Sequence, residues 1–182
     1  MANEWWLDAV RPELSQGDVL PSAPIAIALV PLRHLRSAPL KSGAPGGWSE
    51  SLEFKSDENG VGHFLYRGKI GPAVVLSHDC EIDKATKNKR ITIAPLIPLD
   101  RLNADEQVRI CSQRSFRAMY VPDVPTIGHH YLDLRNTVQL PVELATSSPR
   151  IASMTDDAVI RLRAQLIGFF TRIDLASSQQ AA

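Results

Sequence analysis

Proline is the residue that most limits what this chain can fold into. The 182 residues include thirteen prolines, which is many for this length. Because proline has no backbone N–H and disrupts the interior of a helix, so many prolines favour short strands and structured loops over long helices. We therefore expect a mainly β protein with a minor helical part.

Two helices are nevertheless predicted by their capping residues. Asn103 is followed three residues later by Glu106, the pattern of a capping box, and a short helix is expected over about residues 104–112. Thr155 precedes two aspartates and a run of apolar residues at helical spacing, which predicts a longer helix from Asp156 to Arg172. Its apolar face is expected to pack against the β core.

One stretch, Gly71 to Asp83, combines a strand with reactive side chains. Gly71 and Pro72 read as turn residues, and the apolar run from Ala73 to Leu76 is typical of a buried strand. The side chains that follow it are polar and chemically capable: Ser77, His78, Asp79, Cys80, Glu81 and Asp83. Because functional groups are often placed at the end of a rigid element, we expect a site here.

His78, Asp79 and Cys80 are the candidate catalytic residues. A histidine can serve as a general base near neutral pH, and a thiolate can attack a carbonyl or phosphoryl centre. The alternative for Cys80 is a small, buried apolar side chain, and the alternative for Asp79 is a carboxylate that accepts hydrogen bonds from loop amides. On a continuing strand, His78 and Cys80 would share one face and Asp79 would lie on the other.

Basic residues lie around this stretch and are the candidate substrate-binding residues. They are Arg67, Lys69, Lys84, Lys87 and Arg90, with Arg114 and Arg117 expected close by. Such a group can bind phosphates, although charged loops are usually only solvated. The possible stacking surfaces are Tyr66, Phe116 and Tyr120, which in strands more often belong to the core. The chain has no net charge, so any basic site must be local.

Metal binding is the less favoured interpretation. Asp79, Glu81 and Asp83 could hold Mg²⁺, but they are equally well explained as solvated partners of the lysines that follow. The histidines and cysteines lack the Cys-x-x-Cys and His-x-x-x-His spacings of zinc sites. We expect no metal and no other cofactor.

Four segments, in this order, resemble the MazF/PemK family of toxins from toxin–antitoxin pairs. They are Gln16-Gly-Asp-Val, Gly71-Pro-Ala-Val-Val-Leu-Ser-His-Asp, Ile91-Thr-Ile-Ala-Pro-Leu and Arg150-Ile-Ala-Ser-Met-Thr. The resemblance implies a small SH3-like β-barrel, here elaborated by an insertion at about residues 21–60 and closed by the terminal helix. It also implies a homodimeric ribonuclease with an antitoxin partner.

The chain departs from the family at both catalytic positions. The family's catalytic arginine stands where this chain has Gly71, and its catalytic threonine or serine stands where this chain has Ile97. The predicted function is therefore a catalytically divergent barrel that binds a protein or nucleic acid. The alternative is an endoribonuclease toxin with a site rebuilt around His78 and Asp79, so whether the protein is an enzyme stays open.

The remaining expectations concern domains and location. One domain is expected over residues 1–175, followed by a flexible tail at 176–182. The N-terminus has no signal-peptide pattern, and the longest apolar run, Ile25 to Leu32, is too short to span a bilayer. These features predict a cytoplasmic protein without a membrane partner. The expected partners are an antitoxin or another protein, RNA, and a second copy of the chain.

Overall fold

The computed structural model describes the backbone of residues 4–27, 32–35, 48–51, 64–65, 67–83 and 89–172. Side chains are described at 4–25, 68–82 and 89–172. The predicted cations Lys84 and Lys87, the side chains of Tyr66 and Arg67, and the tail at 176–182 lie outside these residues. The chain divides into two units, one formed by Met1–Pro24 and Ile70–Ala182 and the other by Ile25–Lys69.

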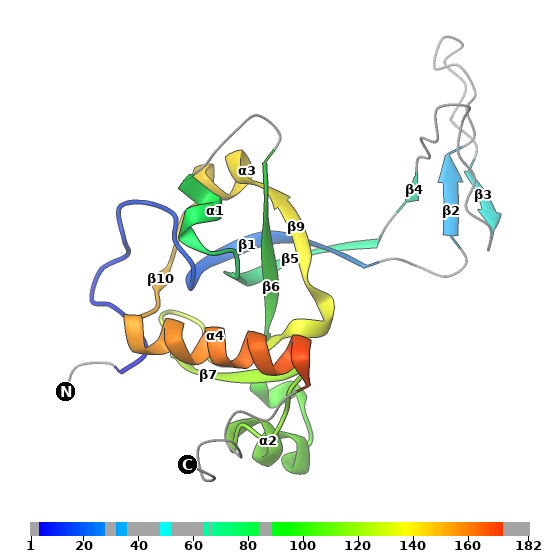
Figure 1. Cartoon of the computed structure of the whole chain (residues 1–182). Coiled ribbons are helices and arrows are strands. Elements are labelled where there is room, and N and C mark those ends of the chain that lie inside the picture. Colours follow the sequence, from blue (N-terminus) through cyan, green and yellow to red (C-terminus); the bar gives the residue numbers. More distant parts are fainter. Residues whose placement is uncertain are drawn as a thin grey trace. The chain divides into compact units, whose positions relative to one another are not determined.

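A strongly curled, seven-stranded sheet is the main element of the first unit (Figure 1). Its strands are β1 (Asp18–Ile27), β5 (Arg67–Val75), β6 (Arg90–Pro98), β7 (Ala118–Val124), β8 (Gly128–Asp133), β9 (Val138–Pro141) and β10 (Ala152–Ser153). The order is β10-β1-β5-β6-β8-β7, and β9 pairs with β6 next to this path. The prediction of a mainly β fold with minor helix is confirmed.

In the described residues, four α-helices and two 3₁₀ turns connect and cover these strands. They are α1 (Asp79–Asp83), α2 (Ala104–Cys111), α3 (Val142–Ser147), α4 (Asp156–Thr171), η2 (Leu99–Arg101) and η3 (Leu134–Asn136). Both predicted caps are confirmed, because Asn103 Oδ1 accepts from Glu106 N at 2.9 Å and Thr155 Oγ1 accepts from Ala158 N at 3.3 Å. None of the helices in the described part of the chain is long and apolar enough to cross a membrane.

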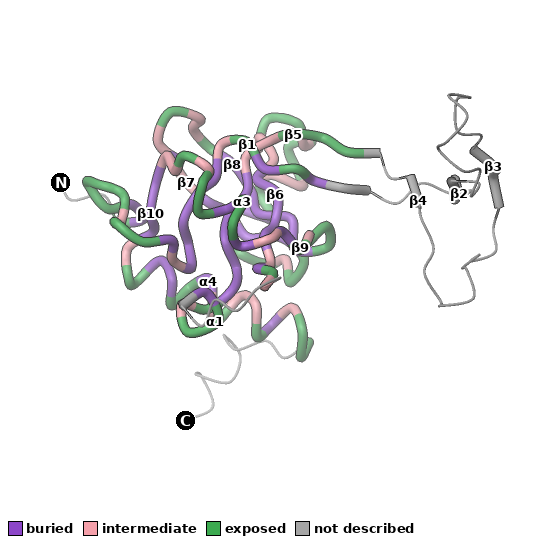
Figure 2. The backbone as a smooth tube through the Cα atoms, turned by 90° about the horizontal axis from the view of Figure 1, so that it is seen from above, coloured by how far each residue is buried: buried purple, intermediate pink, exposed green. Residues whose placement is uncertain are grey.

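Strand β6 divides the core of the first unit in two. Its alternate residues Ala94 and Leu96 enter one apolar cluster, which α4 covers with Ala158, Val159 and Leu162. Ile91 and Ile93 point to the opposite face and enter a second cluster, to which α1 contributes Ile82 and α3 contributes Ala145. Figure 2 shows the buried backbone running along β6, β8 and β10. Both faces of the sheet are therefore covered.

The strand that carries the predicted site is longer than expected. Gly71 and Pro72 lie inside β5, so their assignment to a turn is wrong. The ladder between β5 and β6 begins at Ala73, one residue after Pro72. Because the missing N–H of Pro72 is not needed in that ladder, the strand tolerates the proline.

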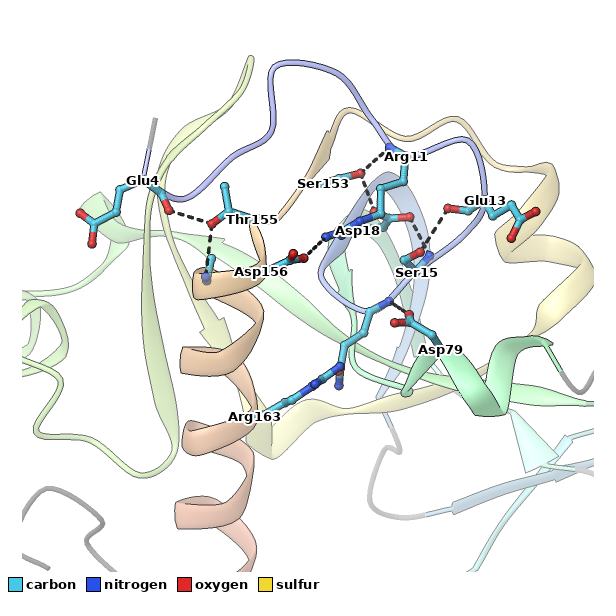
Figure 3. A network of polar contacts seen from close by, with 12 residues as sticks. Glu4, Arg11, Glu13, Ser15, Asp18, Asp79, Ser153, Thr155, Asp156 and Arg163 are labelled. Carbon is cyan, nitrogen blue, oxygen red and sulfur yellow. Dashed lines mark hydrogen bonds and ion pairs between the residues drawn. The ribbon is translucent and has the colours of Figure 1, made fainter. Parts of the chain in front are cut away.

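A buried polar network holds the segment before β1 (Figure 3). The Asp18 carboxylate is fully buried and accepts hydrogen bonds from Ser15 N at 2.9 Å, Ser153 Oγ at 2.6 Å and Arg150 Nη1 at 3.1 Å. A buried charge is tolerated only when it is paired and hydrogen-bonded. The network therefore fixes the start of β1 to β10, and it places Gln16 beside α1.

The second unit contains a three-stranded antiparallel sheet. Its strands are β2 (Leu32–Leu35), β3 (Trp48–Ser51) and β4 (Phe64–Leu65), in the order β3-β2-β4. This unit, Ile25–Lys69, overlaps the predicted insertion at 21–60. The prediction of one elaborated domain over residues 1–175 stays a prediction.

Candidate functional site

The predicted catalytic residues His78, Asp79 and Cys80 lie together where α1 begins. Leu76 N and Ser77 N both donate to Thr92 O, at 2.8 and 3.4 Å, which ends the pairing with β6. The chain then turns into the helix, so the strand geometry considered for these residues does not apply. Asp79 and Cys80 lie in the first turn of α1 instead, and His78 directly precedes it.

Two of these side chains make contacts that hold the helix start in place. His78 Nδ1 accepts from Cys80 N at 3.2 Å, which satisfies a free amide of the first turn. Asp79 Oδ1 accepts from Gln16 N at 2.7 Å (Figure 3). The alternative considered for Asp79, a carboxylate bound to a loop amide, is the arrangement observed. A catalytic role for His78 and Asp79 stays a prediction.

Cys80 is not buried. It is a free, exposed cysteine, so its interpretation as a small buried apolar side chain is wrong. Within the described residues, its thiol makes no hydrogen bond to His78 or to any other group that could act as a base. A nucleophilic cysteine needs such a neighbour or another means of lowering its pKa. This geometry gives no support to nucleophilic catalysis at Cys80.

The predicted substrate-binding cations are only partly described. Arg90 is exposed at the start of β6, and Lys69 is exposed on β5. They fall in different units, so no joint site can be built from them. The expectation that Arg114 and Arg117 lie close to Arg90 is wrong. Both line a pocket beside Tyr131, which pairs with the far end of β6, roughly 20 Å along the strand from Arg90.

Five arginines line this pocket, and we call it the arginine pocket. It has a volume of about 320 Å³. Its arginines are Arg109, Arg114, Arg117, Arg135 and Arg172, and its one carboxylate is Glu106. In a chain without net charge, this is a local concentration of positive charge.

Helices and strands form the base of the arginine pocket. Its floor is an apolar cluster of Ile110, Ala118 and Tyr131, contributed by α2, β7 and β8. Burial, followed by the charge of Asp133, raises the pKa of Tyr131, so the phenol in the floor is neutral at physiological pH. Phe116 lies at the rim and is 39% exposed, so it is a large aromatic surface open to solvent.

Hydrogen bonds fix the segment that carries Arg114 and Arg117. Gln113, with a left-handed φ of 55°, ends α2, and Arg114 N donates to Arg109 O at 3.1 Å. Gln165 Nε2 of α4 donates to Ser115 O at 2.7 Å. The backbone around the pocket is therefore tied to both α2 and α4.

Arg135 is the one arginine of the pocket whose guanidinium is held by a carboxylate in the described chain. Its Nε and Nη2 donate to the two oxygens of Asp133, at 2.9 and 3.1 Å. Burial alone would raise the pKa of Asp133, but the hydrogen bonds from Arg135 and Asn136 outweigh it and lower this pKa. The same pairing raises the pKa of Arg135.

The other arginines of the pocket are available for a ligand. Within the described residues, the guanidinium groups of Arg109, Arg114 and Arg117 make no hydrogen bond or ion pair. Arg172 ends α4 and lies over the Phe169 ring, with 5.8 Å from Cζ to the ring centroid. Unpaired arginines around a hollow are suited to an anion, and they favour phosphate because the guanidinium can donate two parallel hydrogen bonds.

Sequence reasoning found only part of this pocket. Arg114, Arg117 and Phe116 were recognised singly, but Arg109, Arg135 and Arg172 were not. One local signal exists, because residues 109–117 contain three arginines and no acidic residue. Among the described residues, no group of three or more His, Cys, Asp or Glu side chains is placed to hold a metal ion.

Comparison with known proteins identifies no relative of this chain. No protein-family model, no curated protein and no solved structure matches the chain. The resemblance to the MazF/PemK family therefore stays a prediction.

Proposed function

We propose that this protein is a nucleic-acid-binding module that holds a single strand at the arginine pocket. The observation that carries the proposal is the set of five arginines that line a hollow of about 320 Å³, in which, among the described residues, Glu106 is the one lining carboxylate and only Arg135 is paired, with Asp133. This volume lies at the lower end of the range for ligand sites, about 300–1,000 Å³, and suits one nucleotide better than a duplex.

Phe116 supports a nucleic acid over other polyanions. Proteins that bind single strands combine a positively charged groove with aromatic side chains on which bases stack. Phe116 is exposed at the rim, and in the chain it lies two residues after Arg114 and directly before Arg117. Phosphate contacts and a stacking surface are therefore available within one short segment.

Catalysis at His78 and Asp79 is not part of this proposal. Figure 1 shows α1 and α2 at opposite ends of the first unit, so these residues are remote from the pocket. Both side chains also take part in holding the start of α1. A strand held at the pocket would reach them only by crossing the length of the sheet.

The test is fluorescence anisotropy with a labelled single-stranded RNA of about ten nucleotides, titrated at several salt concentrations. We expect log K to fall with log[salt], with a slope of about −0.7 for each phosphate contacted. Arg114→Ala and Arg117→Ala should each weaken binding and make the slope shallower by about 0.7. Arg90→Ala, an exposed arginine at the other end of β6, is the matched control and should change affinity by less than about two-fold.

Two results would overturn the proposal. One is the absence of salt-dependent binding to wild-type protein. The other is an equal loss of affinity in Arg90→Ala and in the pocket variants, because the charge would then act without regard to position. RNA integrity should be followed in the same samples, since cleavage that is lost in His78→Ala or Asp79→Ala would support the endoribonuclease alternative.

A further inference from the structure

Arg135 differs from the other arginines of the pocket in how its guanidinium is held. Its side chain is 55% exposed, whereas the side chain of its partner, Asp133, is 2% exposed. One edge of the guanidinium, Nε and Nη2, faces this buried carboxylate. A guanidinium carries five N–H donors, and within the described residues no hydrogen bond uses Nη1 or the second Nη2 proton of Arg135.

Asp133 is itself fixed from several directions. Besides the two bonds from the guanidinium, its carboxylate accepts from Arg135 N at 3.1 Å and from Asn136 Nδ2 at 2.8 Å. Asp133 ends β8 opposite Ala118 of β7, and Leu134 N donates to Arg117 O at 3.0 Å. The direction of the Arg135 guanidinium is therefore set by the sheet.

We propose that Arg135 is the fixed phosphate contact of the arginine pocket and that Asp133 is the positioning residue that sets the direction of its guanidinium. This inference rests on the proposed function, because it assigns residue roles within that site. Arg109, Arg114 and Arg117 supply positive charge from unrestrained side chains. Arg135 supplies a donor edge whose rotamer freedom has already been lost on folding, so the ligand does not have to order it.

The direction in which Asp133→Asn changes RNA affinity distinguishes a positioning role of Asp133 from a simple effect of its charge. Asp133→Asn removes a negative charge beside an anion site, so if Asp133 acted only through its charge, the variant would bind RNA more tightly. If Asp133 positions Arg135, the variant binds more weakly. The reason is that asparagine replaces one acceptor oxygen with an N–H donor, which cannot accept from the guanidinium.

The experiment compares Asp133→Asn with wild type by anisotropy on the same single-stranded RNA, with unfolding followed in parallel. We expect affinity to fall by about ten-fold and the salt slope to become shallower by about 0.7, the loss of one phosphate contact. A purely structural role would reduce the fraction of folded protein without changing that slope. Asp123→Asn, an exposed aspartate at the turn end of the same hairpin, is the charge control and should stay within about two-fold of wild type.

Arg135→Lys gives a second test that leaves Asp133 in place. Lysine keeps the charge but lacks the planar fork, so we expect a several-fold loss of affinity with little change in stability. The inference would be overturned if Asp133→Asn bound RNA as tightly as wild type or more tightly. It would also be overturned if Arg135→Lys bound RNA like wild type. If Arg114→Ala and Arg117→Ala still weaken binding, either result leaves the proposed function in place. If wild-type protein binds no RNA, both the proposed function and this inference are excluded.

Discussion

The substitution Gly17→Ala tests the packing at the start of β1. Gly17 has a φ of +87°, and a Cβ built on it would lie 2.9 Å from Met154 Cβ and 3.0 Å from Val159 Cγ2. Left-handed backbone costs a residue with a side chain about 1–2 kcal/mol. Carbon atoms prefer about 3.5–4.0 Å, and overpacking a tight core costs about 1–3 kcal/mol. We therefore expect the free energy of unfolding to fall by about 2–5 kcal/mol.

Gly128→Ala is the matched control for this prediction. Gly128 has a similar φ of +80°, but a Cβ there would meet nothing within 4 Å. This variant should lose only the backbone part, about 1–2 kcal/mol. Urea unfolding gives both values, provided that the m-values agree with wild type. If Gly17→Ala loses no more stability than Gly128→Ala, the tight contact with Met154 and Val159 does not exist in the folded protein.

Four further predictions follow from particular contacts. Phe116→Ala should weaken binding to single-stranded RNA by about 1–3 kcal/mol, whereas Phe116→Trp should retain it. If anisotropy gives Phe116→Ala the same affinity as wild type, stacking on Phe116 is excluded. Asp18→Ala should lower the free energy of unfolding by about 3–5 kcal/mol in urea, because it leaves the charge of Arg150 without its carboxylate, and a loss below about 1 kcal/mol would contradict this. The pKa of Asp133 is lowered on folding, so its stabilising contribution is complete above the unfolded pKa, near 4, and is lost as the pH falls through the folded-state value. The difference in free energy of unfolding between wild type and Asp133→Asn should therefore stay constant from neutral pH down to about pH 4 and shrink below it. If this difference already shrinks near neutral pH, the pairing of Asp133 with Arg135 is refuted. Cys80 should react with a thiol reagent in the native protein, and labelling only after denaturation would contradict its exposure.

Local signals in the sequence were sufficient for part of the fold. Asn103 and Thr155 cap helices where expected, because a cap depends on residues within one turn. Strand β6 contains the segment Ile91-Thr-Ile-Ala-Pro-Leu of the family resemblance, and its apolar residues point alternately into two clusters. The proline-rich composition correctly indicated a mainly β fold, but not the length of its strands, because β1 has ten residues and β5 and β6 have nine each.

The rest depended on contacts between distant segments. The strand before His78 ends where Leu76 and Ser77 share Thr92 O, a pairing that cannot be read from residues 71–83 alone. The arginine pocket forms because η3, which follows β8, brings Arg135, and the end of α4 brings Arg172, to the segment after α2. Neither arginine has a neighbour in sequence that would mark it as part of a site.

An NMR titration of isotope-labelled protein with single-stranded RNA tests the central claim, that the arginine pocket binds nucleic acid, most directly. The account predicts that the largest amide shifts fall in residues 113–118 and 134–136, with little change at residues 77–82 and at Arg90. Shifts centred on residues 77–82, or no shifts at any RNA concentration at low salt, would contradict it.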